Sequence, residues 1–343
     1  MTITVGVTAV GGGVGQAVLR ALSYSNLQIR TLGLDMQALS AGLYWADAAF
    51  LVPPASQREK YIRSLSDLCS ECGVDVLIPG SDPELYPLAA ARQQLAECGC
   101  QVIVSNPSAI ELCRDKWALA AFCQEHGLPF VLTYTLLEAQ AQVKTLDYPL
   151  IVKPRSGSGS VGVRLVFTPT ELLSLPVDKD YIVQPYLPPD DSELPTPELS
   201  ILTHELTQTN ELSLQFFVGS KGEILGSFSS RNRLKNGIPV EVITDVKSSV
   251  LEQATELLLA LVAQGVRGPI NLQGRMTEEG VRFFEVNPRF TGLTGVRASL
   301  GYREVDAAIW TFFMDQPAAA RSCLPVSTGH NVALRHVEET VIP

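Results

Sequence analysis

Short apolar runs alternate with amphipathic segments over the first hundred residues. Runs with the length and β-branched content of buried strands occupy residues 3–10, 29–35, 47–52, 74–79 and 100–104. Apolar residues at helical spacing occupy the intervening segments 16–22, 58–73 and 84–99. Because strands that alternate with helices of this length are typical of a parallel, doubly wound sheet, the pattern predicts a Rossmann-like α/β domain over residues 1–107.

A second unit follows Pro107, a residue type that favours a helix start. Helical spacing predicts helices over residues 114–127 and 138–145, and apolar runs predict strands over residues 130–134, 148–154 and 180–187. A Gly/Ser-rich loop at 155–163 ends in a further strand. We expect these elements to form one lobe over residues 108–187.

The remainder, residues 188–343, reads as a second lobe built on antiparallel strands. Strands are expected at 211–218, 222–230, 239–244, 268–276 and 280–288, and a long amphipathic helix at 245–265. The segment GSKGE at 219–223 is typical of a hairpin turn, and residues 294–315 predict one or two closing helices. The fold class is therefore α/β, with a parallel-sheet domain followed by a two-lobed α+β domain.

Composition and charge limit the classes of function. The 343 residues include 26 Lys and Arg against 36 Asp and Glu, a formal net charge of −10, and no basic stripe. This balance argues against a nucleic-acid partner. No apolar run approaches the roughly 20 residues that span a bilayer, and the N-terminus lacks the basic segment of a signal peptide. We expect a cytoplasmic protein with no membrane partner, and leave a homodimer open.

Seven cysteines, an odd count, argue against a disulfide framework. The spacings Cys69-x-x-Cys72 and Cys98-x-Cys100 raise a zinc site as one interpretation. Buried thiols at helix ends are the simpler one.

The loop GGGVG at 11–15 follows a strand and precedes a helix, so its backbone N–H groups are suited to face an anion. Asp35, at the end of the second strand, would complete a dinucleotide site by holding a ribose. The fingerprint G-x-G-x-x-G requires a third glycine where this chain has Gln16. Close packing of helix on strand explains the glycines equally well.

The second glycine-rich loop carries more information. A strand ends at Lys153, and the loop that follows alternates glycine with serine, namely Ser156, Gly157, Ser158, Gly159, Ser160 and Gly162. Such a loop can lie over a phosphate chain and donate backbone N–H groups, while the lysine adds a positive charge. A hairpin loop without a ligand is the alternative.

A polar cluster lies in the last predicted hairpin. Glu285 and Asn287 are two apart on one strand, so their side chains share a face, and Gln273 lies on the partner strand. Carboxylate and amide oxygens suit Mg²⁺ that also binds substrate phosphates. Arg289 would offset charge on a transferred phosphoryl group. An exposed ion pair between Glu285 and Arg289 is the alternative.

An ordered set of motifs along nearly the whole chain resembles the ATP-grasp superfamily, and within it the ATP-binding halves of carbamoyl-phosphate synthetase. The set comprises Lys116 in RDKW, Lys153 in VKPRSGSGSVGV, VQPYL at 183–187, Glu211 in NELSLQF, and NLQGR with FFEVNPRFTG. The first hundred residues are similar to the domain that precedes ATP-grasp in this branch, including GSDPELYPLA at 80–89.

The resemblance implies a role for each matching residue. Lys116 and Lys153 would bind the α- and β-phosphates under the Gly157–Gly162 loop, and Glu211 the ribose. The adenine would lie against the hinge formed by Gln184, Tyr186 and Leu187. Gln273, Glu285 and Asn287 would hold one or two Mg²⁺ ions, and Arg289 would stabilise an acyl phosphate. Phosphate or carboxylate binding on the substrate side would fall to Arg231 and Arg233.

Two departures from the family pattern affect these roles. Pro185 removes a backbone N–H from the hinge, where the family often has Glu. The insertion 188–210 separates the hinge from Glu211, so the ribose role depends on correct strand pairing.

The implied activity is that of a Mg-ATP-dependent ligase that activates a small carboxylic acid as an acyl phosphate and joins it to an amine. We expect the acceptor pocket between Asp82 and Glu84 on one side and residues 294–297 on the other, with Arg297 either a carboxylate ligand or a structural residue. Two alternatives stay open: a nucleotide-binding regulator without turnover, and a nicotinamide-dependent oxidoreductase that uses the N-terminal loop.

Overall fold

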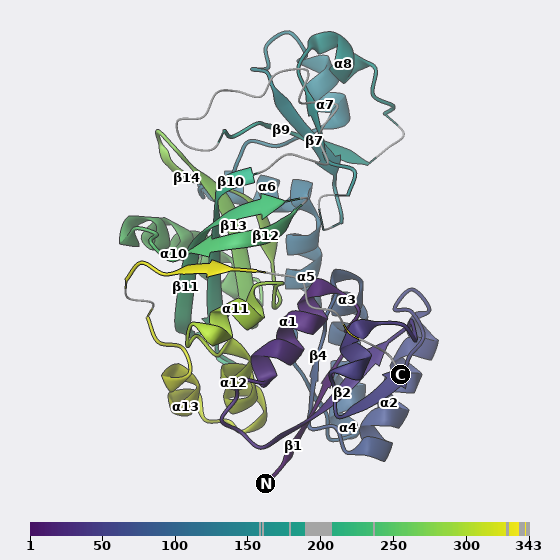
Figure 1. Cartoon of the computed structure of the whole chain (residues 1–343). Helices are drawn as coiled ribbons and strands as arrows, with labels where there is room; N and C mark the ends of the chain where they lie inside the picture. Colours follow the sequence, from purple (N-terminus) through teal and green to yellow (C-terminus); the bar gives the residue numbers. More distant parts are fainter. Residues whose placement is uncertain are drawn as a thin grey trace.

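Three parts make up the computed structural model of the chain: an N-terminal domain, a small lobe and a lobe built on a large sheet (Figure 1). The structure describes residues 1–157, 159, 161–177, 180–188, 208–235, 237–326, 329–335 and 340.

The N-terminal domain contains the predicted parallel sheet. Its strand order is β3-β2-β1-β4-β5, and the strands are β1 (Ile3–Val7), β2 (Ile29–Asp35), β3 (Ala48–Leu51), β4 (Val76–Ile78) and β5 (Gln101–Val102). The helical elements are α1 (Gly13–Leu22), η1 (Ala41–Tyr44), α2 (Arg58–Cys72), α3 (Asp82–Ala90) and α4 (Arg92–Glu97). The single helix expected over 84–99 is wrong, because the chain breaks at Ala91 into α3 and α4.

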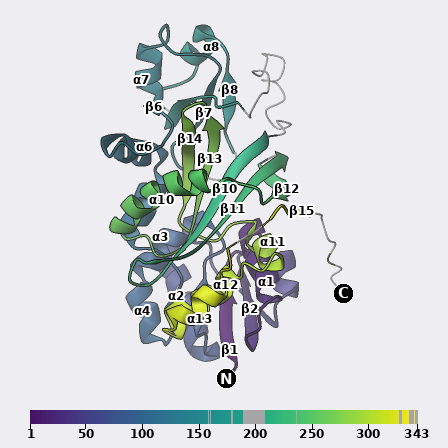
Figure 2. The ribbon, with the colours of Figure 1, turned by 90° about the vertical axis from the view of Figure 1, so that its left-hand side faces the viewer.

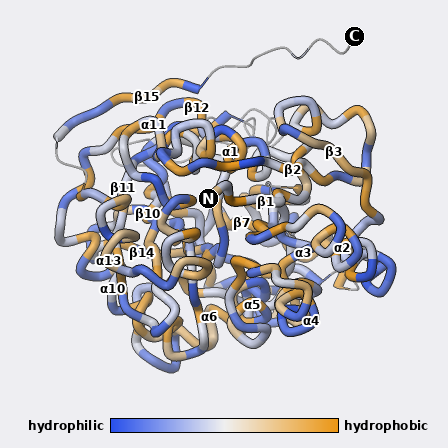
Figure 3. The backbone as a smooth tube through the Cα atoms, turned by 90° about the horizontal axis from the view of Figure 1, so that it is seen from below, coloured by the Kyte–Doolittle hydropathy of each residue, from blue (hydrophilic) through white to orange (hydrophobic). Residues whose placement is uncertain are grey.

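The two faces of this sheet have different cores. On one face, Leu32, Leu34 and Leu77 pack with Leu65 of α2 and Leu88 of α3. On the other face, apolar residues of β1 and α1 pack against residues far away in the sequence, in α11 (Thr294–Ser299) and α12 (Glu304–Ala308). Figure 3 shows hydrophilic and hydrophobic positions alternating along the helices around β1, as expected for amphipathic helices. The C-terminal helices therefore complete the first domain.

The small lobe is a four-stranded antiparallel sheet in the order β6-β9-β7-β8. Its elements are β6 (Tyr134–Thr135), α7 (Leu136–Ala141), β7 (Leu150–Pro154), β8 (Arg164–Val166), α8 (Pro169–Leu173) and β9 (Tyr181–Pro185). The helix expected at 138–145 begins and ends earlier, since Thr135 and Glu138 form a capping box that fixes its start.

The large sheet has six strands in the order β14-β13-β10-β11-β12-β15. They are β10 (Gln208–Val218), β11 (Ile224–Lys235), β12 (Ile238–Ile243), β13 (Gly268–Thr277), β14 (Gly280–Asn287) and β15 (Val332–Leu334). One face is covered by α10 (Ser248–Ala263), α5 (Pro107–Arg114) and α6 (Lys116–Glu125). Residues 108–125, which we expected in the small lobe, thus contribute to the core of the large sheet instead.

The closing helices expected over residues 294–315 are present as α11, α12 and the turn that follows them, whereas no element beyond residue 315 was predicted. A π-helical turn η2 (Ile309–Phe313) and α13 (Pro317–Ser322) follow α12, and β15 then pairs with β12 at the sheet edge. Figure 2 shows β15 and α11 on the same side of the molecule as α1. No helix in the described ranges is long and apolar enough to cross a membrane.

The cysteines give no support to the zinc interpretation. All seven are free thiols, with Cys69 and Cys100 buried. Within the described part of the chain, no group of three or more His, Cys, Asp or Glu side chains is placed to hold a metal.

Gly80 allows the β4–α3 turn to approach β1 closely. A Cβ at this position would lie 2.0 Å from the backbone oxygen of Thr8, which cannot move without disturbing the central strand. We therefore expect Gly80→Ala to destabilise the protein by about 2 kcal/mol or more in urea unfolding. Gly13→Ala is the matched control, because its Cβ would meet no atom of the described residues within 4 Å. Equal stability of the two variants would contradict this account of the turn.

Candidate active site

A cavity of about 1010 Å³ lies where the three parts of the chain meet. It is lined by α1 and the start of α3 in the first domain, by β7 and β9 of the small lobe, and by one face of the large sheet. Its volume is at the upper end of the range of about 300–1,000 Å³ typical of small-molecule sites. The cavity therefore has room for more than one substrate.

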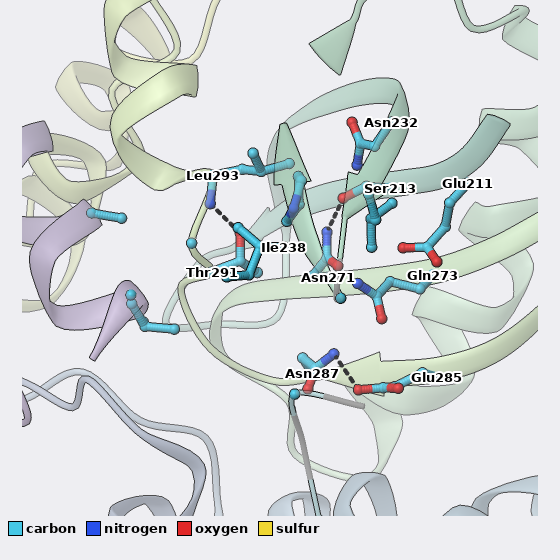
Figure 4. A pocket seen from close by; sticks show the side chains of 18 of the residues that line it. Glu211, Ser213, Asn232, Ile238, Asn271, Gln273, Glu285, Asn287, Thr291 and Leu293 are labelled. Atoms are coloured by element: carbon cyan, nitrogen blue, oxygen red, sulfur yellow. Dashed lines mark hydrogen bonds between the residues drawn. The ribbon is translucent and has the colours of Figure 1, made fainter. Parts of the chain in front are cut away.

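The polar wall of the cavity follows from strand alternation in the large sheet. Gln273 lies directly opposite Glu285, and on its other side opposite Ser213. Figure 4 shows Glu211, Gln273, Glu285 and Asn287 around one space. The prediction that Gln273, Glu285 and Asn287 share a face is confirmed.

The chemistry of this wall fits a hard divalent cation. Asn287 Nδ2 donates to Glu285 Oε1 at 3.2 Å, so the two side chains touch. Asn271, opposite Asn287, donates its Nδ2 to Ser213 Oγ at 2.9 Å, and its buried Oδ1 has no hydrogen-bond partner among the described residues. One carboxylate among several amide oxygens matches Mg²⁺, which takes few protein ligands and keeps substrate phosphates and waters as the others.

Asp115 connects the start of α6 with the beginning of the glycine-rich loop. Its Oδ1 accepts from the backbone N–H groups that open α6, and its carboxylate forms a two-bond ion pair with Arg155, at 2.7 and 2.6 Å. Lys116, the next residue, is buried and donates its Nζ to the Gly157 carbonyl at 2.8 Å. The lysine at the helix start is thereby tied to the glycine-rich loop.

Lys153 is a charged side chain with little solvent around it. It is 7% exposed, and its Nζ donates to the Phe284 carbonyl at 3.3 Å and lies 5.2 Å from the centre of the Phe284 ring. Burial lowers the pKa of Lys153 to about 8, against the opposing effect of Glu285. Burial likewise raises the pKa of Glu211 to about 7, despite the nearby charge of Arg275.

The glycine-rich loop borders the cavity through Gly157 and Gly159. Both have positive φ angles, 131° and 69°, which favour glycine. Ser156 and Gly162 do not line the cavity, and the predictions for Ser158 and Ser160 lie outside the described residues.

The hinge lies at the end of β9. Gln184, Pro185, Tyr186 and Leu187 all line the cavity, as expected. The backbone N–H of Tyr186 donates to the Pro149 carbonyl at 3.1 Å, and Pro185 has no N–H. An adenine edge would therefore have to be recognised by other backbone groups of this segment.

Glu211 reaches the cavity despite the preceding insertion. Its strand β10 pairs with both β11 and β13, and Glu211 lies opposite Asn232, which also lines the cavity. The strand pairing on which its expected role depends is present, although most of the insertion lies outside the described residues.

Arg289 joins the first domain to the polar wall. Its guanidinium forms a two-bond ion pair with Asp82, at 2.6 and 2.8 Å, and donates to Asn287 Oδ1 at 3.1 Å. The side chain of Arg289 is 10% exposed. It lines the cavity, as predicted, and is held by a carboxylate of the first domain.

The structure does not bring Arg231 and Arg233 to the site. Both lie on the face of β11 opposite to that of Asn232, and neither lines the cavity. Arg231 Nε donates to Asp245 at 2.7 Å, and Arg233 Nη2 to Glu241 at 3.1 Å. The prediction that they bind the substrate is therefore wrong, since strand alternation turns them away.

Arg297 is a structural residue. It is 1% exposed, forms an ion pair with the fully buried Glu304 at 2.7 Å, and donates to Thr291 and Thr294. It does not line the cavity, so the interpretation as a carboxylate ligand is wrong.

Glu84 is likewise buried and hydrogen-bonded inside the first domain. Its carboxylate accepts from Thr8 Oγ1 and from Tyr61 OH, each at 2.8 Å. Burial raises the pKa of Glu84, although these hydrogen bonds lower it. Of the expected acceptor pair, only Asp82 lines the cavity.

Asp35 is occupied by the backbone of its own domain. It is 7% exposed, and its two oxygens accept from the N–H groups of Gly11 and Gln37, at 2.7 and 2.9 Å. A carboxylate used in this way stabilises the GGGVG loop and is not placed to hold a ribose.

Several residues that line the cavity were not predicted from the sequence. Arg275 and Asn271 lie two residues either side of Gln273 on β13, so strand alternation alone was a sufficient signal for both. Arg20 and Arg335, at opposite ends of the chain, also line the cavity, and no sequence signal brings them together.

Comparison with protein families identifies the class of the chain. Residues 9–103 match the PylC-like, N-terminal domain, and residues 113–293 match the ATP-grasp domain. The second match covers more than half of the chain, which therefore belongs to the ATP-grasp family.

The curated relatives are distant and longer. The chain is 26% identical to the biotin carboxylase of Halalkalibacterium halodurans over 172 residues, which is 46% of this chain and 37% of the relative. It is 24% identical to the carbamoyl phosphate synthase large chain of an Arthrobacter species, over 63% of this chain and 19% of the relative. The chain thus spans well under half the length of these proteins.

Solved structures share the fold. N5-carboxyaminoimidazole synthetase from Staphylococcus aureus, complexed with ADP, aligns with a TM-score of 0.65 at 17% identity and covers 97% of this chain and 80% of its own. An L-amino acid ligase from Bacillus licheniformis aligns with a TM-score of 0.60 at 16% identity, over 86% and 68% of the two chains. The expected α/β architecture with ATP-grasp lobes is confirmed.

The buried charge of Lys153 should cost stability in the nucleotide-free protein. Between about pH 8 and pH 10.5 the unfolded chain holds this proton and the folded chain does not, so stability rises with pH in that window. We expect Lys153→Met to stabilise the protein by up to about 3 kcal/mol at neutral pH, a gain that shrinks as pH rises through the window. Urea unfolding of both proteins across this range measures the difference. A difference that does not change with pH would contradict the assignment.

Proposed function

We propose that the chain is an ATP-dependent ligase that activates a small-molecule carboxylic acid as an acyl phosphate and joins it to an amine. The observation that carries the proposal is the polar wall of Gln273, Glu285 and Asn287 facing two buried lysines across one cavity. A site that only bound an uncharged metabolite would not require two buried cations. Burying the two lysine charges costs desolvation free energy, and phosphates would offset that cost by pairing with the lysines.

In this proposal the two lysines bind the nucleotide phosphates. Lys116 and Lys153 lie close enough for each charge to act on the other, and phosphate oxygens would replace the carbonyls of Gly157 and Phe284 as their partners. Glu211 would accept from the ribose hydroxyls. The hinge residues from Gln184 to Leu187 would enclose the adenine.

Glu285, Asn287 and Gln273 would hold Mg²⁺, which neutralises phosphate charge and orients the terminal phosphoryl group when bound. The carboxylate of the acid would attack the γ-phosphorus, forming a C–O–P linkage as the bond to the β-phosphate oxygen breaks. Arg289 would donate to the phosphoryl oxygens while Asp82 keeps its guanidinium in place.

The amine would then attack the acyl carbon, forming the amide and releasing phosphate, with its proton passing to phosphate or solvent. Water must be excluded, because it would hydrolyse the acyl phosphate. Gly157 and Gly159 lie in the loop that would close over the nucleotide.

Hydroxylamine tests the proposal without knowledge of the natural amine, since it converts an acyl phosphate into a stable hydroxamate. We expect MgATP and a panel of carboxylic acids to yield hydroxamate and ADP in equal amounts. Nucleotide binding by calorimetry, without ADP release for any acid, would instead favour a regulator without turnover. Failure to bind MgATP would contradict the nucleotide site itself.

Glu285→Gln keeps the shape of the side chain and removes the carboxylate from the proposed metal site. We expect hydroxamate formation to fall by about 100-fold or more, with an unchanged unfolding midpoint. Glu279→Gln, at the exposed end of the same hairpin, is the matched control and should leave the rate unchanged. Retained turnover in the Glu285 variant would remove this residue from the site.

A further inference from the structure

The cavity continues past the polar wall into a region where apolar side chains gather. This region lies between α1, the segment that leads from Arg289 into α11, and the strand β12. Figure 4 shows Ile238, Thr291 and Leu293 together at one side of the pocket. We call this region the apolar end, and define it by the residues Val14, Ala17, Ile238, Leu293 and Val296.

Close packing of α11 on α1 builds the apolar end. A Cβ at Gly295 would lie 3.2 Å from the carbonyl oxygen of Ala17, and a Cβ at Gly292 would lie 3.9 Å from the carbonyl oxygen of Gly13. Val14 and Val296 come directly after Gly13 and Gly295, and both line the cavity. The two helices therefore bring apolar side chains to the same part of it.

Apolar surface stays open at this end of the cavity. Ile238 is 57% exposed on β12, and Val14 and Val296 are partly exposed. A single exposed apolar residue is ordinary on a protein surface, but apolar side chains gathered in a concave site are typical of ligand binding. The apolar end thus has the character of a surface that a ligand would cover.

Two arginines also line this part of the cavity. The aliphatic stem of Arg20 lies against α11, since a Cβ at Gly295 would come within 3.2 and 3.3 Å of Arg20 Cβ and Cδ. Arg20 interacts with other groups of the chain, and Arg335 Nη1 donates to the Pro239 carbonyl at 3.1 Å. Because both arginines have partners in the protein, we assign neither guanidinium to the substrate.

The carboxylates of the cavity come from other elements. Among the described residues that line it, the acidic ones are Asp82, Glu211 and Glu285, on α3, β10 and β14. These elements do not form the apolar end, so this set of carboxylates does not favour a cationic group there.

Arg289 connects the apolar end to the reacting group of the acid. Its Nη1 donates to the Phe290 carbonyl at 2.9 Å, and the N–H of Leu293 donates to Thr291 Oγ1 at 3.2 Å, so the segment between them is compact. Leu293 lies four residues after Arg289, and both line the cavity. An acyl group held beside Arg289 would therefore have the rest of its molecule next to Leu293.

We propose that the apolar end holds the hydrocarbon body of the carboxylic acid substrate. The acid would place its carboxylate beside Arg289, and a chain or ring of carbon atoms against Ile238, Leu293 and Val296. The substrate class is thus a carboxylic acid whose body is apolar and uncharged. This inference rests on the proposed ligase function, and it adds the class of acid to it.

Hydroxamate formation by the full chain, with MgATP and hydroxylamine, tests the inference. The probes are linear monocarboxylic acids from propanoate to octanoate, together with the dicarboxylic acids of the same carbon numbers. We expect kcat/KM of the monoacids to rise about threefold for each added methylene until the apolar end is filled. Each long monoacid should exceed its diacid at least about tenfold, because a second carboxylate would lose its hydration among apolar side chains.

Ile238→Ser removes apolar surface at an exposed position, where the fold does not depend on the side chain. We expect the ratio of kcat/KM for octanoate to that for propanoate to fall about tenfold, and Ile238→Leu to retain the ratio. Val332→Ser is the matched control, because Val332 is 54% exposed on β15 of the same sheet and does not line the cavity. Its ratio should equal that of the wild type.

Four outcomes would overturn the inference and leave the ligase function in place: hydroxamate from amino acids or diacids but from no monoacid, kcat/KM independent of chain length, faster reaction of the diacids, or an unchanged ratio in the Ile238→Ser protein. Absence of hydroxamate with every acid, or failure to bind MgATP, would contradict the proposed function and the inference with it. The two kinds of failure are therefore distinguished in one set of assays.

Discussion

The ion pair between Asp82 and Arg289 holds the first domain against the polar wall of the large sheet. The two residues are 207 positions apart, and both bonds of the guanidinium to the carboxylate are short, at 2.6 and 2.8 Å. Because Arg289 follows the strand that carries Glu285 and Asn287, this pair sets the distance between α3 and β14. Breaking a largely buried pair by removing one partner leaves a charge without compensation, so the arrangement is strongly enforced. The cavity between the two parts depends on it.

The cavity concentrates charge that the folded protein stabilises poorly without a ligand. Lys153 and Lys116 are buried close together, and Glu211 is buried among apolar and polar neighbours. Burial moves the pKa values of Lys153 and Glu211 towards neutrality, to about 8 and about 7. Residues with pKa values shifted in this way are common at functional sites. There, the charge of a ligand can offset the free-energy cost of burying them, which the protein alone does not offset. The buried charges of Lys153 and Glu211 therefore lower the stability of the ligand-free protein and at the same time favour the binding of a charged ligand.

Sequence periodicity was sufficient for much of the fold and for part of the site. The alternation of strands and helices in the first hundred residues predicted the parallel sheet, and the period of two in the last hairpin placed Gln273, Glu285 and Asn287 on one face. The same period would have shown Arg275 and Asn271 beside Gln273. For Arg231 and Arg233 the predicted strand ended too early, at residue 230. Strand β11 continues to Lys235, and its alternation turns both residues away from the cavity.

The sequence by itself determined the local elements, the order of the motifs and the chemical character of the residues that we propose to bind phosphate and metal. These depend on neighbours within a few residues or on a single strand pairing. Tertiary structure alone decided that Asp82 pairs with Arg289 and that Arg20 lies near Arg335. It also decided that Arg297 and Glu84 bond to partners in the protein interior and do not line the cavity. Each of these contacts depends on how separate elements pack together, as α11 packs against α1, and no local period in the sequence encodes such packing. The residues that define the far end of the cavity could therefore be seen only in the folded molecule.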